Sequence, residues 1–190
     1  MLDSLKNACN MADTTTNLID ENAVLARWNE LDAEGAAREI LPCCGSSAWA
    51  DGVTGRRPFA DLDELFEASD WVWAGLPEDA WQQAFDSHPR IGQQHARSST
   101  AESLAWSSTE QSAAATDEDA TKLALAEANR QYEEKFGRIF IVCASGRSAA
   151  EILAICHERM KNAAADEMLE SAEQQRQITQ LRLRKWLGVT

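Results

Sequence analysis

The length of 190 residues suggests one domain or at most two small ones, and the 44% hydrophobic and 26% charged residues are a balance typical of a soluble globular protein. Its 18 Lys and Arg residues stand against 31 Asp and Glu residues, which gives a formal charge of −13. A surface of that sign repels phosphate backbones, so we expect no nucleic-acid partner. The longest apolar stretch, residues 139–144, is far too short to cross a bilayer, so we expect no membrane segment.

The cysteines and the first residues predict where the protein works. Five cysteines without a CxxC pair argue against a disulfide framework and favour a reducing compartment. Residues 1–21 lack the basic and apolar regions of a signal peptide, and we interpret them as a poorly defined tail before one domain at 22–190. The expected location is the cytoplasm.

Helix signals recur along most of the chain, because apolar residues return at spacings of three and four. Capping residues and prolines then give the expected boundaries. Four expected helices have both ends defined: from Asp20 or Asn22 to just before Pro42, from Pro77 through Phe85, from Ala149 to Met160, and from about Ala165 to Leu187. For three more only the start is defined, at Asp61, Ser107 and Thr116. Ser107 and Glu110 are read as the S-x-x-E start of a helix.

One segment, residues 139–143, has the composition of a β-strand. A lone strand cannot satisfy its own backbone groups, so it either pairs across a dimer axis or presents its main chain to a ligand. The expected fold class is therefore a single all-α domain with one short extended segment near 139–143.

His88 is the first candidate for chemistry. Pro89 disfavours helical backbone at the residue before it, so a helix must end here and leave the imidazole at its exit. Histidine is the side chain best suited to proton transfer near neutral pH. The alternative is a half-buried histidine that only closes a helix.

Glu110 and Arg182 are the other two charged candidates. As a first-turn residue, Glu110 would either cap its helix or point into a cleft, where Gln111 could bind an amide or urea group. Arg182 falls on the inward face of the last helix, between Ile178 and Trp186. It would either cover Trp186 with its stem while its head reaches water, or grip a carboxylate.

A metal site is not expected. His88, His95 and Glu110 lack the spacing of known ligand motifs. The vicinal pair Cys43 and Cys44 is interpreted as a tight turn with a buried thiol.

Several short segments, taken in order, resemble the OHCU decarboxylase family, where OHCU is 2-oxo-4-hydroxy-4-carboxy-5-ureidoimidazoline. The resemblance covers about residue 22 to the end of the chain. It rests on Cys43-Cys44-Gly45-Ser46 with Trp49-Ala50, Arg57-Pro58-Phe59, His88-Pro89-Arg90-Ile91-Gly92, Ser107 to Gln111, Asn129 with Tyr132 and Phe136-Gly137, Phe140 to Arg147, Arg159 with Asn162, and Ile178-Thr179 with Leu181-Arg182-Leu183. The Ser-Gly-Arg after Cys143-Ala144 is similar to the bacterial branch.

This resemblance implies an all-α fold, a homodimer, and decarboxylation of OHCU to (S)-allantoin in urate breakdown, with no cofactor. By correspondence, His88 is the catalytic histidine, Glu110 its partner acid and Arg182 the active-site arginine. The implied substrate contacts are Pro89, Ser107, Gln111 and the main chain of Ile141, Val142, Cys143 and Ala144.

Two other function classes stay open beside the decarboxylase. A metal-dependent hydrolase of cyclic ureides would contain zinc and lose activity with a chelator. A non-catalytic helical interaction module would tolerate changes at His88, Glu110 and Arg182 without loss of partner binding.

Overall fold

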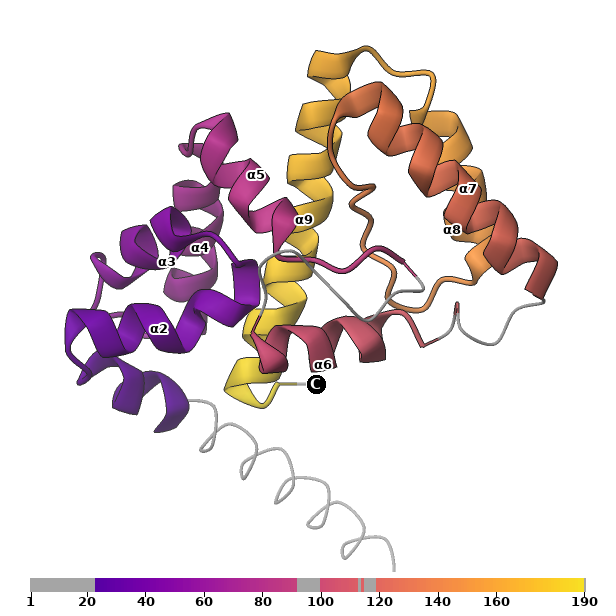
Figure 1. The fold of residues 1–190 in the computed structure, drawn as a ribbon. Helices are drawn as coiled ribbons and strands as arrows, with labels where there is room; N and C mark the ends of the chain where they lie inside the picture. The colour runs from indigo at the N-terminus through magenta and orange to yellow at the C-terminus, as the bar shows by residue number, and fades with distance from the viewer. Residues whose placement is uncertain (1–22, 92–99, 113, 115–118, 190) are drawn as a thin grey trace, which may run out of the picture.

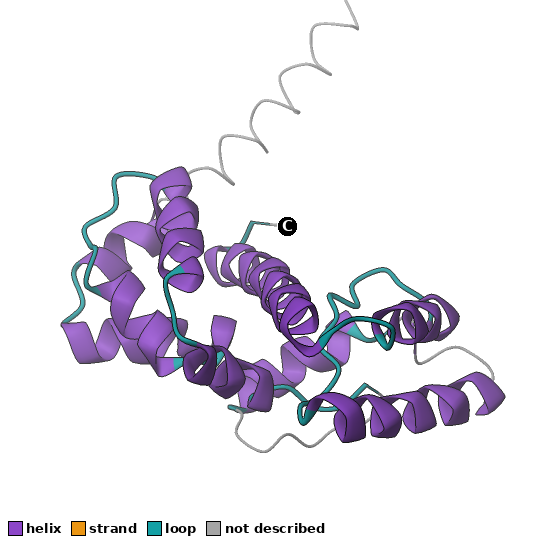
Figure 2. Ribbon diagram, turned by 90° about the horizontal axis from the view of Figure 1, so that it is seen from above, coloured by secondary structure: helices purple, strands orange, loops and turns teal. Residues whose placement is uncertain are grey.

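The structure, a computed structural model, describes residues 23–91, 100–112, 114 and 119–189. All regular secondary structure in these ranges is helical, and they contain no β-strand (Figure 2). The expected all-α fold is confirmed. The expected tail at residues 1–21 lies outside the described residues.

A short helical segment at residues 23–29 precedes the labelled helices. These are α2 (Ala33–Cys44), α3 (Ser47–Thr54), α4 (Leu62–Ala74), α5 (Glu78–Asp86), α6 (Ala101–Glu110), α7 (Asp119–Phe136), α8 (Ala149–Arg159) and α9 (Ala164–Leu187). The long α9 runs between the N-terminal helices on one side and the α7–α8 pair on the other (Figure 1).

The first expected helix differs from the structure in two ways: it is interrupted at residues 30–32, and it does not end before Pro42. The chain leaves the helix at residues 30–32, and α2 then begins after Asp32, whose side chain accepts a hydrogen bond from the Gly35 amide at 2.6 Å. Pro42 does not stop the helix but lies inside α2, which continues to Cys44. A proline this close to a C-terminus removes only one helical hydrogen bond, so the last turn tolerates it. Gly45, with a φ of 86°, ends the helix instead.

The expected helix start at Ser107 is also wrong. Thr100 caps α6 by accepting a hydrogen bond from the Ser103 amide at 3.1 Å, so Ser107 and Glu110 lie in the last turn of that helix. A spacing of three places two residues on the same face at either end of a helix. The S-x-x-E pattern was therefore a pair on one face, and the interpretation of Glu110 as a capping acid fails.

The remaining expected boundaries agree with the structure wherever it describes them. Asp61 caps α4, Pro77 precedes the first residue of α5, and α9 starts at Ala164, one residue before the expected position. The start expected at Thr116 lies outside the described residues.

The helices enclose two apolar cores on either side of the extended segment 139–144. The first core joins residues 23–29, α2, α3, α4, α5 and α9 and contains Trp28, Trp49 and Phe85. The second joins α7 and α8 and contains Tyr132 and Ile152. No helix within the described part of the chain is both long and apolar enough to span a membrane.

Candidate active site

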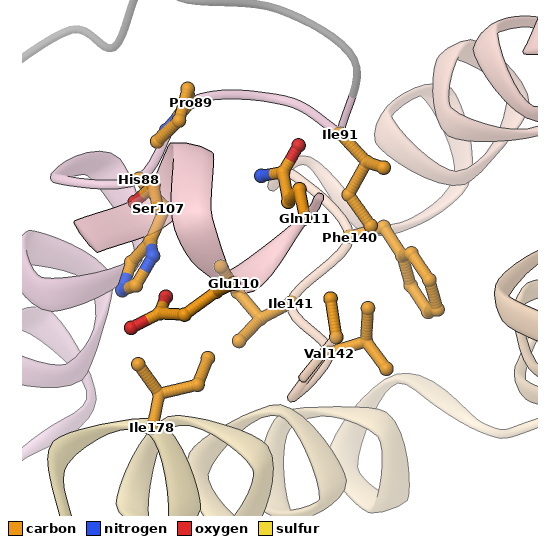
Figure 3. Close-up of a pocket in the computed structure, with 11 residues that line it drawn as sticks. His88, Pro89, Ile91, Ser107, Glu110, Gln111, Phe140, Ile141, Val142 and Ile178 are labelled. Carbon is orange, nitrogen blue, oxygen red and sulfur yellow. The ribbon is translucent and has the colours of Figure 1, made fainter. Parts of the chain in front are cut away.

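A small pocket opens where α5, α6, α9 and the extended segment meet (Figure 3). Its cavity volume is about 20 Å³. The lining residues are His88, Pro89, Ile91, Ser107, Glu110, Gln111, Phe140, Ile141, Val142, Ala144 and Ile178. The pocket thus gathers residues from four parts of the chain that are far apart in sequence.

His88 reaches this pocket because α5 ends just before it. The backbone amide of His88 closes the last turn on the carbonyl of Phe85 at 3.0 Å, and Pro89 then prevents the helix from continuing. The side chain is buried, with 8% of its surface exposed. Figure 3 shows its imidazole on the same side of the pocket as the carboxylate of Glu110.

The surroundings of His88 keep its imidazole neutral. Burial, together with the positive charge of Arg182, lowers the pKa of His88 to about 3, while a hydrogen-bonding interaction with the Gln175 side chain acts weakly in the opposite direction. Both His88 Nε2 and Gln175 Oε1 are buried without a partner at good hydrogen-bonding geometry. At neutral pH His88 therefore offers one lone pair and one N–H rather than a positive charge.

Arg182 is fully buried at the base of the site, and its head does not reach water. Its Nη2 donates to Ser107 Oγ at 2.8 Å and Glu110 Oε2 at 3.0 Å, and its Nε donates to Glu110 Oε1 at 3.1 Å. Its Nη1 donates to Ser103 Oγ at 3.1 Å and to the Pro42 carbonyl at 3.4 Å. These contacts use all five donors of a guanidinium. The alternative in which the arginine merely covers Trp186 is wrong.

The carboxylate of Glu110 therefore sits in a two-pronged ion pair with Arg182. The Nζ of Lys185 lies 3.7 Å from the same carboxylate, and only 9% of the Glu110 side chain is exposed. This arrangement fixes the carboxylate at the pocket wall beside Gln111. Its oxygens can accept hydrogen bonds there without moving.

Eight of the ten residues expected at the site line the pocket, and two do not. Arg182 lies behind Ser107 and Glu110, and the amide of Cys143 is bound by Gln174 Oε1 at 2.9 Å. Three lining residues, Ile91, Phe140 and Ile178, were not among the predicted site residues. Ile178 was detectable, because it precedes Arg182 by one helical turn on the same face of α9.

A second hollow of about 700 Å³ lies along α7 and shares Ile91 with the first. Its wall includes Arg90, Arg130 and Glu133. Arg90 forms an ion pair with Glu133, and Arg130 forms one with Glu134, so these charges already have partners in the protein. The described residues that line this hollow include no histidine.

Cysteine and metal chemistry find little support in the described residues. Cys43 and Cys44 end α2 rather than form a turn, both are buried as expected, and burial raises the pKa of the Cys44 thiol to about 12. Within the described ranges, no group of three or more His, Cys, Asp or Glu side chains could hold a metal ion. His95 lies outside the described residues.

Comparison with known proteins decides the family. The sequence matches the family model of OHCU decarboxylase over residues 29–184, which is most of the chain. The chain belongs to the OHCU decarboxylase family.

Relatives of known name agree with this assignment. The chain is 38% identical over 144 residues to the uric acid degradation bifunctional protein TTL of Arabidopsis thaliana. The match covers 75% of this chain but only 44% of that protein, so the chain spans less than half the length of this relative.

Solved structures of similar fold include an OHCU decarboxylase crystallised in the presence of (S)-allantoin. That structure superimposes with a TM-score of 0.69 at 35% identity and covers 79% of this chain and 97% of its own. A crystal structure of (S)-allantoin synthase has a TM-score of 0.64 at 14% identity, covering 85% of this chain and 53% of its own, and shows a shared fold alone.

Proposed function

We propose that this OHCU decarboxylase converts OHCU to (S)-allantoin in urate breakdown, with His88 as its acid/base group. The observation that carries the proposal is the pocket in which a neutral buried histidine and an ion-paired carboxylate face the same small space. Membership of the family supports the reaction, and the pocket supports the residues.

The reaction does not require the protein to form a covalent bond with the substrate. When CO2 leaves, the electron pair of the broken carbon–carbon bond passes into the adjacent C=N and C=O system of the ring. One proton must then be delivered to one face of the ring. These needs are met by orientation and proton transfer, and neither step requires an electron sink beyond the substrate itself.

His88 and Glu110 suit this proton transfer. Because the free imidazole is neutral, His88 takes a proton from the substrate hydroxyl before it returns one to the ring carbon. The fixed carboxylate of Glu110 orients the imidazole or that hydroxyl. Arg182 serves as a positioning residue, since all its donors already bind protein groups.

The other residues expected at the site hold the substrate. Gln111, Ser107 and Pro89, together with the main chain of Ile141, Val142, Cys143 and Ala144, provide the proposed contacts to the ureido arm and the ring. A cavity of about 20 Å³ has room for about one water molecule, so OHCU binds only when lining side chains move apart.

The proposal keeps three further expectations from the sequence, namely a homodimer, a cytoplasmic location and a reaction without a cofactor. The dimer is tested by light scattering on the purified chain, which should give twice the mass of one chain.

The competing metal-dependent hydrolase is separated from the decarboxylase by one assay. Protein dialysed against a chelator should release CO2 from OHCU at the rate of untreated protein, because the proposed mechanism uses only side chains. Loss of CO2 release on chelation, with recovery on added zinc, would instead favour a metal enzyme. Consumption of OHCU without CO2 release would contradict a decarboxylase of any kind.

A further inference from the structure

The extended segment 139–144 lies between two cores without a neighbouring strand among the described residues. Its side chains alternate, since Phe140, Val142 and Ala144 pack into the second core while Ile139 and Ile141 pack into the first. This is the period of a β-strand. The backbone groups that a strand would pair must therefore find partners of another kind.

Side chains from α8 and α9 supply two of these partners. The Ile141 carbonyl accepts a hydrogen bond from Arg159 Nη1 at 2.7 Å, and the Cys143 amide donates to Gln174 Oε1 at 2.9 Å. Both bonds hold backbone that flanks Val142, and Ile141, Val142 and Ala144 all line the pocket. The main chain at the pocket is thus placed by residues outside it.

Arg159 is itself firmly held. Its Nε and Nη2 donate to Glu167 Oε1 at 2.9 and 2.5 Å, and its Nη2 also donates to Ser171 Oγ at 3.1 Å. Glu167 is fully buried and accepts further hydrogen bonds from Tyr132 and Asn162. A buried charge pair is weak evidence for added stability, but one with this many partners fixes geometry.

Gln174 is oriented just as definitely. Its Nε2 donates to the carboxylate of Glu170 one turn earlier, at 3.0 Å. A carboxylate accepts and does not donate, so the amide nitrogen must face Glu170 and the amide oxygen must face Cys143. Only 9% of Gln174 is exposed, so the glutamine that accepts the hydrogen bond from the Cys143 amide is itself buried.

We propose that Gln174 and Arg159 are positioning residues that fix the pocket-lining backbone of residues 141–144 and thereby the binding of the ureido arm of OHCU. This inference rests on the proposed function. It assigns a role to two residues that do not line the pocket, and it explains how a strand-like segment persists in a helical protein.

The test uses Gln174, because removal of Arg159 would leave Glu167 as an unpaired buried charge and risk unfolding. In Gln174→Met the side chain keeps its length but loses the acceptor for the Cys143 amide. We expect KM for OHCU to rise about ten-fold with kcat nearly unchanged, since a binding contact is lost and the proton-transfer groups are untouched.

Two matched variants accompany it. Gln174→Glu combined with Glu170→Gln exchanges the two side chains, keeps an acceptor for Cys143 and keeps the bond between residues 170 and 174, so KM should return to within about two-fold of the original. Gln177→Met removes a glutamine that makes the same kind of bond, to Glu173 at 2.9 Å, on the same helix away from the pocket lining. It should leave KM unchanged.

Amide hydrogen exchange separates this inference from the proposed function. Exchange at Cys143 should quicken in Gln174→Met and stay slow in Gln177→Met and in the exchanged pair. If the original protein does not turn over OHCU, the proposed function fails, while the exchange data still decide the positioning claim. An unchanged KM in a turning-over Gln174→Met variant, or unchanged Cys143 exchange, would overturn the inference.

Discussion

Replacement of His88 by alanine is expected to lower kcat/KM for OHCU by at least about 10²-fold, and up to about 10⁴-fold, while the protein stays folded. The reason is that His88 is the one imidazole among the described residues that line the pocket, and its neutral ring carries the lone pair and the N–H needed to accept and return a proton. Steady-state kinetics measure the loss, and circular dichroism in the far ultraviolet checks the fold.

His88→Asn serves as the matched control. Asparagine keeps a polar side chain of similar width at the end of α5 but cannot transfer a proton. The His88→Asn variant should therefore be as inactive as His88→Ala, and it should have a higher free energy of unfolding than His88→Ala. If His88 only closed the helix, both variants would keep a rate near that of the original protein. That result would contradict the assignment of His88 as the acid/base group.

The pH profile adds a second readout for the same residue. Because burial and the charge of Arg182 hold the pKa of His88 near 3, the free enzyme has no ionisation of this group near pH 6.5. The profile of kcat/KM should therefore lack an inflection assigned to His88 between pH 5 and 8.

Replacement of Arg182 by methionine is expected to lower the free energy of unfolding by about 3–5 kcal/mol. The Arg182 side chain is fully buried and the Glu110 side chain is nearly so. Removal of the guanidinium therefore leaves a desolvated carboxylate whose remaining ion pair is with Lys185. Denaturant unfolding at constant m-value measures the change.

A double variant separates stability from activity. Arg182→Met combined with Glu110→Gln removes both charges, so it should recover part of the lost stability, as buried pairs often do when both partners are replaced. Activity should not recover, because the carboxylate at the pocket wall is gone. Recovery of both would mean that the pair is structural only.

Arg176→Met is the matched control on the same helix. Arg176 also forms ion pairs, with Asp70 and Glu173, but about a third of its side chain is exposed. Exposed pairs contribute little, so the loss should stay below about 1 kcal/mol. A cost equal to that of Arg182→Met would contradict the importance of burial in this argument.

Local sequence patterns predicted the elements that depend on local chemistry. Pro89 fixes the end of α5 and with it the position of His88, and the stripe of apolar residues in the last helix places Arg182 on the inward face. These two features required only neighbouring residues, and the structure has both.

The pairing of Glu110 with Arg182 was beyond the reach of local patterns. Glu110 and Arg182 lie 72 positions apart in the sequence. The S-x-x-E spacing of Ser107 and Glu110 fits the start of a helix as well as it fits the end of α6, where these two residues lie. The strand-like segment shows the same limit. Its β-strand composition was readable from the sequence, but its hydrogen-bonding partners are the side chains of Arg159 and Gln174 on helices.

The most direct test of the proposed reaction is the handedness of its product. OHCU would be generated in place by uricase and hydroxyisourate hydrolase, and circular dichroism would follow allantoin formation by the purified chain. We predict rapid growth of the (S)-allantoin signal above the spontaneous racemic background, and background alone with His88→Asn. A trace from the original protein that matches the background would contradict the assignment of this pocket to OHCU decarboxylation.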